Sequence, residues 1–232
     1  MKKHGRTSES RLINYIINYF ENLGFLTTTE LNLGYGRADI VAFRVNPSNC
    51  QARFENKQLR SIDRLDYYTL LRLLPEFENE DPISLDFLAD QLKFSASHIR
   101  SELLSFLIRF GYAIEVEPRQ YAKINGFIPV VDEIVAVEAK VKDWKKGAIQ
   151  AKRYQVFANR VFLALSVNYF HRVNCEILKK HNIGLLTIGD KIMKRLTAPK
   201  LLPKDCDRFN FATEWLWRYR RQDIKRVLSN VS

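Results

Sequence analysis

Motifs that drive several kinds of enzyme chemistry are missing from this 232-residue sequence. It contains neither a GxxxxGK(S/T) loop nor a GxGxxG loop, so nucleotide-driven work is not indicated. The four histidines lack HxxxH or HxH spacing, and there is no GxSxG motif. Hydrolysis without a metal ion therefore has no candidate site.

Cysteines and long apolar runs are also scarce. The three cysteines, Cys50, Cys175 and Cys206, lack CxxC spacing, so neither a disulfide framework nor a zinc knuckle is predicted and a reducing compartment fits. The first residues, MKKHGRTSESRL, contain no apolar signal core, and no apolar run approaches the ~18 residues that crossing a membrane requires. We expect a cytoplasmic protein without membrane contact.

The charge balance is strongly basic. Lys and Arg number 37 against 26 Asp and Glu, which gives a formal net charge of +11. Such a balance favours polyanionic partners, although charge alone does not separate nucleic acid from an anionic membrane surface. The hydrophobic fraction of 46% is ordinary for a folded protein, and the length suits one large or two small domains. We expect DNA as the partner.

One stretch carries the pattern of a catalytic site. The run VAVEAKV, residues 135–141, predicts a strand in which Glu138 and Lys140 share a face, because alternate side chains of a strand point the same way. If the run GRADIVAF, residues 36–43, forms the neighbouring strand, Asp39 brings a second carboxylate. Two carboxylates beside a lysine can hold a hard divalent cation and stabilise an anionic transition state. This pattern is typical of phosphodiester cleavage.

A helix is predicted after this strand, from about Lys146 to Ala158. Gln150 and Tyr154 stand four residues apart and so share one side of it. Taken alone, they also fit an ordinary surface glutamine and an ordinary helical tyrosine. The basic residues around the site would collect backbone phosphates even without chemistry. They are Arg37, Lys142, Lys145, Lys146, Lys152 and Arg153.

The order of these motifs resembles the PD-(D/E)XK nuclease superfamily, which includes many restriction enzymes, Holliday-junction resolvases and repair nucleases. The resemblance covers residues 8–44 and 130–190. Ala38 replaces the proline of the family motif, and nearly a hundred residues part the two acidic motifs, which demands an inserted module. The matching residues are Glu9, Asp39, Glu138, Ala139, Lys140, Gln150 and Tyr154.

The resemblance implies an α/β fold with a restriction endonuclease-like mixed sheet flanked by helices. It implies Mg²⁺ or Mn²⁺ held by Asp39 and Glu138, with the Ala139 carbonyl as a further ligand and Glu9 as an outer one. Glu9 also fits a carboxylate that complements the positive end of its helix. Oxygen ligands without nearby His or Cys select these ions over zinc.

The implied roles of the other site residues concern water and the strand to be cut. Lys140 would orient or help to deprotonate the attacking water, and it would offset charge on the phosphate. Gln150 and Tyr154 would position the scissile strand.

The inserted module is predicted at residues 61–125 as an α+β domain. Helices near 67–74, 84–92 and 97–110, followed by strands 112–117 and 120–124, look like a winged helix-turn-helix domain. In the DNA-binding use of that fold the third helix enters the major groove. Many winged helices instead serve dimerisation or domain packing, and both uses stay open. The residues that would face DNA are Lys93, His98, Arg100 and Arg119.

The flanking segments are predicted to form one nuclease domain, with residues 1–60 as its first part and 126–232 as its second. We interpret residues 46–62 as a linker or an irregular lead into the insertion, because they lose periodicity and contain Pro47. The basic tail interleaves Trp215, Trp217 and Tyr219, which we interpret as packing anchors of a last helix rather than base-stacking platforms.

Three functions remain open at this point. The leading hypothesis is a metal-dependent DNA endonuclease of restriction, resolvase or repair type. The second is a non-catalytic DNA-binding protein that uses the nuclease-like domain and winged helix as one surface. The third is a module that docks a partner subunit in a defence or repair assembly. Cutting two strands with one site per chain would favour a homodimer.

Overall fold

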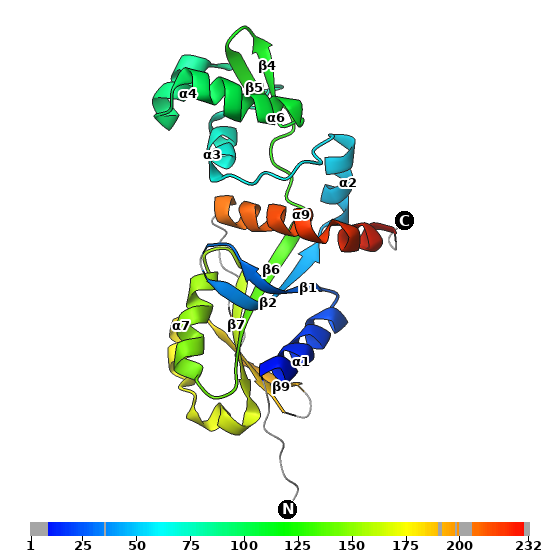
Figure 1. Cartoon of the computed structure of the whole chain (residues 1–232), viewed down its shortest axis with the longest axis vertical. Coiled ribbons are helices and arrows are strands. Elements are labelled where there is room, and N and C mark those ends of the chain that lie inside the picture. The colour runs from blue at the N-terminus through cyan, green and yellow to red at the C-terminus, as the bar shows by residue number, and fades with distance from the viewer. Residues whose placement is uncertain (1–8, 35, 190–191, 198, 200–205, 230–232) are drawn as a thin grey trace, which may run out of the picture. The chain divides into compact units, whose positions relative to one another are not determined.

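The computed structural model describes residues 9–34, 36–189, 192–197, 199 and 206–229 (Figure 1). Part of the basic tail, at 200–205, lies outside these residues. The chain divides into two compact units, one formed by Met1–Val45 with Val131–Asp205 and the other by Asn46–Val130 with Cys206–Ser232.

The first unit is built on a six-stranded mixed sheet with the order β1-β2-β6-β7-β8-β9. The middle strands β6, β7 and β8 are parallel, whereas β1, β2 and β9 pair in antiparallel fashion. The bounds are β1 Leu26–Asn32, β2 Arg37–Val45, β6 Val131–Lys140, β7 Arg160–Ser166, β8 Gly184–Ile188 and β9 Ile192–Thr197.

Helices cover this sheet on both faces, as predicted for an α/β sheet flanked by helices (Figure 1). Helix α1, Glu9–Asn22, buries Leu12, Ile16 and Phe20 in a core that includes Val137 and Ala139 of β6. Helix α7, Trp144–Tyr154, packs on the opposite face, to which Glu138 and Lys140 belong because side chains alternate along a strand. The shorter helices η2, Val167–Arg172, and α8, Cys175–Lys180, complete the unit.

The second unit combines helices with a small three-stranded sheet of order β3-β5-β4. Its core contains Leu70, Leu88, Leu103 and Leu107, none of which is exposed. The bounds are α2 Pro47–Glu55, α3 Leu65–Leu73, β3 Ile83–Ser84, α4 Leu85–Leu92, α5 Ala96–His98, η1 Ile99–Leu104, α6 Ser105–Arg109, β4 Ala113–Glu117, β5 Gln120–Lys123 and α9 Cys206–Ser229.

The helical segment at residues 96–109 of this unit contains a π-helical stretch, η1. The backbone N–H of Ser105 donates to the carbonyl of Arg100, five residues earlier, so the carbonyl of Ser101 loses its usual partner. The Ser105 hydroxyl donates to that carbonyl instead. The serine side chain therefore supplies a hydrogen bond to a carbonyl of the widened turn.

The prediction of a linker at residues 46–62 was wrong for its first half. The Asn46 side chain accepts a hydrogen bond from the Asn49 backbone at 2.8 Å, and Pro47 begins the helix, so α2 has both a cap and a favourable first residue. The units also divide at 45/46, 130/131 and 205/206 rather than at the predicted 60/61 and 125/126, and α9 belongs to the second unit.

A buried ion pair explains why α9 belongs there. Arg53 of α2 and Glu214 of α9 are fully buried and bonded to each other through both guanidinium nitrogens. The carboxylate also accepts from the backbone of Ile62 at 2.8 Å, and the guanidinium donates to the Tyr112 hydroxyl at 2.8 Å and to the Gln58 carbonyl at 3.0 Å. This network joins α2, the 56–64 loop, the start of β4 and α9.

No helix in the described part of the chain combines the length and the apolar character that crossing a bilayer requires.

Arg53→Met should destabilise the protein by roughly 3–5 kcal/mol, because it leaves the Glu214 carboxylate buried without its counter-charge. Chemical denaturation measures the change. The control is Arg64→Met, whose 2.6 Å pair with Asp66 is partly exposed and should contribute no more than about 1 kcal/mol. Equal losses in the two variants would contradict the role assigned to the buried pair.

Candidate active site

Adjacent strands bring the predicted acidic residues together. Ladder pairing between β2 and β6 reaches Ile40 opposite Val137, and Asp39 is the next residue towards the start of β2. The Asp39 carboxylate accepts a hydrogen bond from the Ala139 backbone at 2.8 Å, so it lies directly beside the Glu138-Ala139-Lys140 segment. The predicted juxtaposition of Asp39 with this segment is therefore present.

Glu138 is the centre of the cluster. It is only 1% exposed, and each of its carboxylate oxygens has a partner. Oε1 lies 2.6 Å from Nζ of Lys140, and Oε2 lies 2.6 Å from the hydroxyl of Tyr154. Glu138 and Lys140 therefore share a face of β6, as the alternation of side chains along a strand predicts. Tyr154 reaches the same carboxylate from the helix predicted to follow the strand.

The pKa values of both Glu138 and Lys140 are raised, but burial acts on the two groups in opposite directions. Burial raises the pKa of the Glu138 carboxyl, and the negative charge of Asp39 adds to this, while hydrogen bonds from Lys140 and Tyr154 oppose it. Burial alone would lower the pKa of Lys140, but the bond to Glu138 and the charges of Glu138, Asp39 and Glu9 raise it overall. Lys140 is thus held as a cation beside a carboxyl that binds protons unusually well.

The Tyr154 hydroxyl links the cluster to β2. It lies within hydrogen-bond distance of both Glu138 Oε2 and the backbone carbonyl of Arg37, at 2.6 and 2.8 Å. A phenol carries one proton and can donate to only one of the two acceptors at a time. Burial raises the pKa of Tyr154, and the bond to Glu138 raises it further, so the hydroxyl stays protonated.

Gly147 allows α7 to approach the strands closely. A Cβ atom on Gly147 would lie 2.6 Å from Cδ1 of Leu163 and 2.9 Å from Cγ of Lys140, which is shorter than side chains tolerate. Glycine in the interior of a helix is otherwise unfavourable. This glycine was missed in the sequence, although its place in the middle of a predicted helix was a signal of close packing.

Gln150 lies one turn before Tyr154 on α7. Its side-chain Oε1 is buried and, within the part of the chain that the structure describes, has no hydrogen-bond partner. An unpaired buried acceptor costs free energy unless a water or ligand satisfies it. This orphaned atom fits the predicted role of Gln150 in positioning.

The donor set suits a hard cation. Asp39, Glu138 and the Ala139 carbonyl offer only oxygen, and Mg²⁺ typically uses one or two carboxylates with water and substrate oxygens as its other ligands. Glu9 is exposed in the first turn of α1 and acts on Lys140 through its charge. Among the described residues no group of three or more Asp, Glu, His or Cys is close enough to hold a metal, so Glu9 does not join the two carboxylates in such a group.

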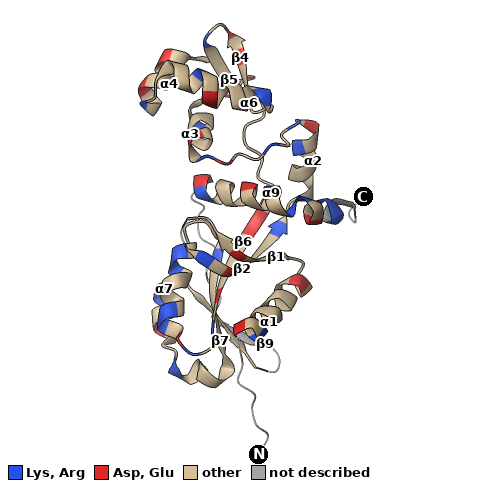
Figure 2. Ribbon diagram, in the orientation of Figure 1, with Lys and Arg blue, Asp and Glu red and all other residues tan. Residues whose placement is uncertain are grey.

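Exposed basic side chains lie on the elements that form the cluster. Figure 2 shows Lys and Arg along α7, and Asp143 caps this helix by accepting from the Lys146 backbone at 3.1 Å. Arg37 is exposed and pairs loosely with Glu30, at 3.7 Å. The other basic residues predicted near the site are all exposed. They are Lys142, Lys145, Lys146, Lys152 and Arg153.

The basic residues predicted to contact DNA from the inserted module all belong to the second unit, and several have acidic neighbours. Arg119 pairs with Asp86 at 2.7 Å and Lys93 with Asp90 at 3.1 Å, while the His98 ring packs against Phe94. Arg100 interacts electrostatically with Glu115. The positive charge of this surface is therefore partly balanced within the unit.

Comparisons of the chain with family models, with curated proteins and with solved structures found no match.

The electrostatics of the cluster predict opposite shifts in two variants. Lys140→Met should raise the pKa of Glu138, because it removes a cation and a hydrogen bond, whereas Asp39→Asn should lower it, because it removes a neighbouring negative charge. NMR titration of carboxyl-labelled glutamate measures both pKa values, and in the unmodified protein the value should lie above the usual 4.5.

The control for this titration is Lys179→Met, which removes an exposed lysine from its 2.8 Å pair with Glu176 on α8. It should leave the pKa of Glu138 unchanged. Shifts of the same sign in Lys140→Met and Asp39→Asn would contradict the assigned geometry.

Proposed function

We propose that this protein is a metal-dependent DNA endonuclease that hydrolyses phosphodiester bonds. The observation that carries the proposal is the cluster of Asp39, Glu138 and Lys140, in which a buried carboxylate is bonded to a lysine on the same strand. An ion pair between Glu138 and Lys140 that served only the fold would not need a second carboxylate beside it. The negative charge of Asp39 makes ionisation of Glu138 less favourable and so raises its pKa. Two carboxylates placed together in spite of this repulsion are expected where the site binds a cation.

The fold of the first unit is compatible with this function. Its mixed sheet, with one helix on each face beside the acidic strands, resembles the restriction endonuclease-like arrangement. Mg²⁺ or Mn²⁺, when bound by Asp39, Glu138 and the Ala139 carbonyl, would polarise the phosphate and lower the pKa of a bound water.

The protein side chains then have separate tasks. The Lys140 ammonium would give up its bond to the Glu138 carboxylate. It would then offset the negative charge that develops on the phosphate. The Gln150 oxygen could accept a hydrogen bond from the attacking water, which would satisfy the buried acceptor. Tyr154 would hold Glu138 and the start of β2 in place through its hydroxyl.

The second unit supports a role in holding the substrate. Its helices α3, α4 and 96–109, followed by the β4–β5 hairpin, occur in the order of a winged helix-turn-helix domain. In that role Lys93, His98, Arg100 and Arg119 would face DNA, in competition with the acidic neighbours of Lys93 and Arg119. The described residues form one such cluster per chain, so cutting both strands would need two copies. The compartment we propose is the cytoplasm.

A non-catalytic DNA-binding protein is the second candidate. It is favoured by the engagement of both Glu138 oxygens, one by Lys140 and the other by Tyr154, with which a metal would have to compete. The basic surface of α7 would suffice for binding backbone phosphates in that case.

Metal-dependent cleavage is the test of the first candidate. The purified chain should cut one or more of supercoiled, linear, single-stranded and branched DNA with Mg²⁺ or Mn²⁺ but not with EDTA. Lys140→Met should lower the rate by about 10²–10³-fold, the range expected for loss of one group that stabilises the developing negative charge. Glu138→Gln should abolish cleavage.

The exposed pair on α8 provides matched controls, because Lys179→Met and Glu176→Gln make the same chemical changes away from the cluster. Both should cut as the unmodified protein does. Folded protein that cuts no substrate, yet binds duplex DNA in a salt-sensitive manner that survives Asp39→Asn, would overturn the endonuclease and favour the second candidate.

A further inference from the structure

Two adjoining hollows of the second unit lie between the 56–64 loop and α9. One has a volume of about 400 Å³ and the other about 430 Å³, and they share Ser61, Asp63 and Arg218 in their walls. Volumes of this size are within the range of small-molecule sites, ~300–1,000 Å³. Because the two hollows share lining residues, one extended ligand can occupy both.

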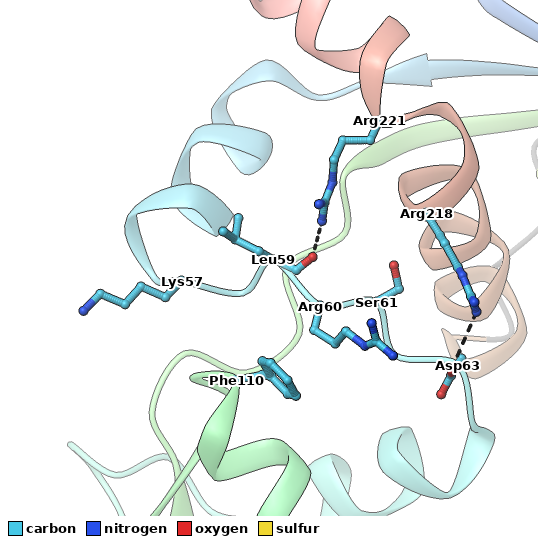
Figure 3. A pocket seen from close by; sticks show the side chains of 8 residues that line it. All are labelled: Lys57, Leu59, Arg60, Ser61, Asp63, Phe110, Arg218 and Arg221. Atoms are coloured by element: carbon cyan, nitrogen blue, oxygen red, sulfur yellow. Dashed lines mark hydrogen bonds and ion pairs between the residues drawn. The ribbon is translucent and has the colours of Figure 1, made fainter.

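The first hollow is cationic. Its described lining includes Lys57, Arg60, Arg218 and Arg221, with Asp63 as the carboxylate among these residues. Figure 3 shows the three arginines and Asp63, whereas the Lys57 side chain points away from them. Arg218 lies 3.7 Å from Asp63, and both side chains are about half exposed, so this pair is weak. Within the described residues, Arg60 has no ion-pair partner for its guanidinium. An anion is therefore the ligand that this hollow favours.

Arg221 is prepared for such a ligand. Its guanidinium stacks on the Trp217 ring, 4.8 Å from the centroid, and one terminal nitrogen donates to the Leu59 carbonyl. Its Nε is buried and has no acceptor among the residues that the structure describes. Burial and the nearby charge of Arg53 lower the pKa of Arg221. An anionic oxygen in the hollow would supply a counter-charge to the Arg221 guanidinium.

The second hollow is aromatic. It is lined by Phe211, Trp215 and Tyr219, and the rings of Trp215 and Tyr219 lie 4.4 Å apart at an angle of 36°. Tyr219 is 57% exposed, whereas Trp217, two residues earlier and so on the opposite side of α9, is fully buried. The expectation that these aromatics are packing anchors therefore holds for Trp217, but Tyr219 leaves a ring open to a ligand.

We propose that these hollows bind a single-stranded segment of nucleic acid, with backbone phosphates at Arg60 and Arg221 and a base on the Tyr219 ring. Cations that track the backbone beside an exposed aromatic platform are the general means of binding single strands. Duplex DNA does not offer the face of an internal base, so the aromatic hollow selects an unpaired strand or end. This site is separate from the acidic cluster and does not depend on cleavage.

Fluorescence anisotropy with a labelled oligothymidylate, in EDTA and over a range of salt concentrations, tests this proposal. Arg60→Gln should weaken binding and should reduce the slope of log K against log salt by about 0.7, the value for one phosphate contact on a single strand. Tyr219→Ala should weaken binding about 5-fold or more without changing that slope, because stacking involves no counterion release.

Two controls make the same changes outside the hollows. Arg226→Gln alters an exposed arginine of α9 whose neighbour is Asp223, and Phe77→Ala removes an exposed ring of the same unit. Both should bind as the unmodified protein does. Circular dichroism verifies that all variants are folded.

The proposal would be overturned if folded Arg60→Gln and Tyr219→Ala bound the strand no more weakly than their controls. It would also be overturned if binding of a duplex fell as much as binding of the strand in Tyr219→Ala. Displacement of the strand by free thymidine monophosphate at concentrations similar to those of unlabelled oligothymidylate would identify a nucleotide site in place of a strand site.

Discussion

The buried carboxylate of Glu138 is the constraint on which the candidate site depends. A charge at this depth is costly unless it is paired, and here a lysine two residues along the same strand and a tyrosine from α7 supply the partners. Both partners require their elements to be in place. The strand must alternate without a bulge at Ala139, and α7 must lie close enough for Tyr154 to reach, which Gly147 permits. Site and packing are therefore formed together.

The second unit has its own organising pair. Arg53 and Glu214 are 161 residues apart in the sequence, yet they share a fully buried contact. Their bonds to Gln58, Ile62 and Tyr112 hold the 56–64 loop against α9. The same loop and the same helix line the cationic and aromatic hollows. The rigidity that the ion pair provides therefore extends to the surface where we propose that a single strand binds.

Short-range periodicity explains what could be predicted. A period of two placed Glu138 and Lys140 on one face, and a spacing of four placed Gln150 and Tyr154 on one side of a helix. The α/β character followed from the alternation of apolar strands and helices. By contrast, α2 was missed because its buried face includes Arg53, which no apolar pattern reveals. The assignment of α9 to the first domain also failed. Its buried Glu214 pairs with Arg53, which is too far away in the sequence for local patterns to reveal.

Binding of a divalent metal without any DNA tests the central claim most directly, because it asks whether the two carboxylates form a cation site. Electron paramagnetic resonance titration with Mn²⁺ should show one bound ion per chain, and Asp39→Asn should lose it. The matched control Glu176→Gln, which removes an exposed carboxylate on α8, should bind as the unmodified protein does. No bound Mn²⁺, or equal binding after Asp39→Asn, would contradict the account.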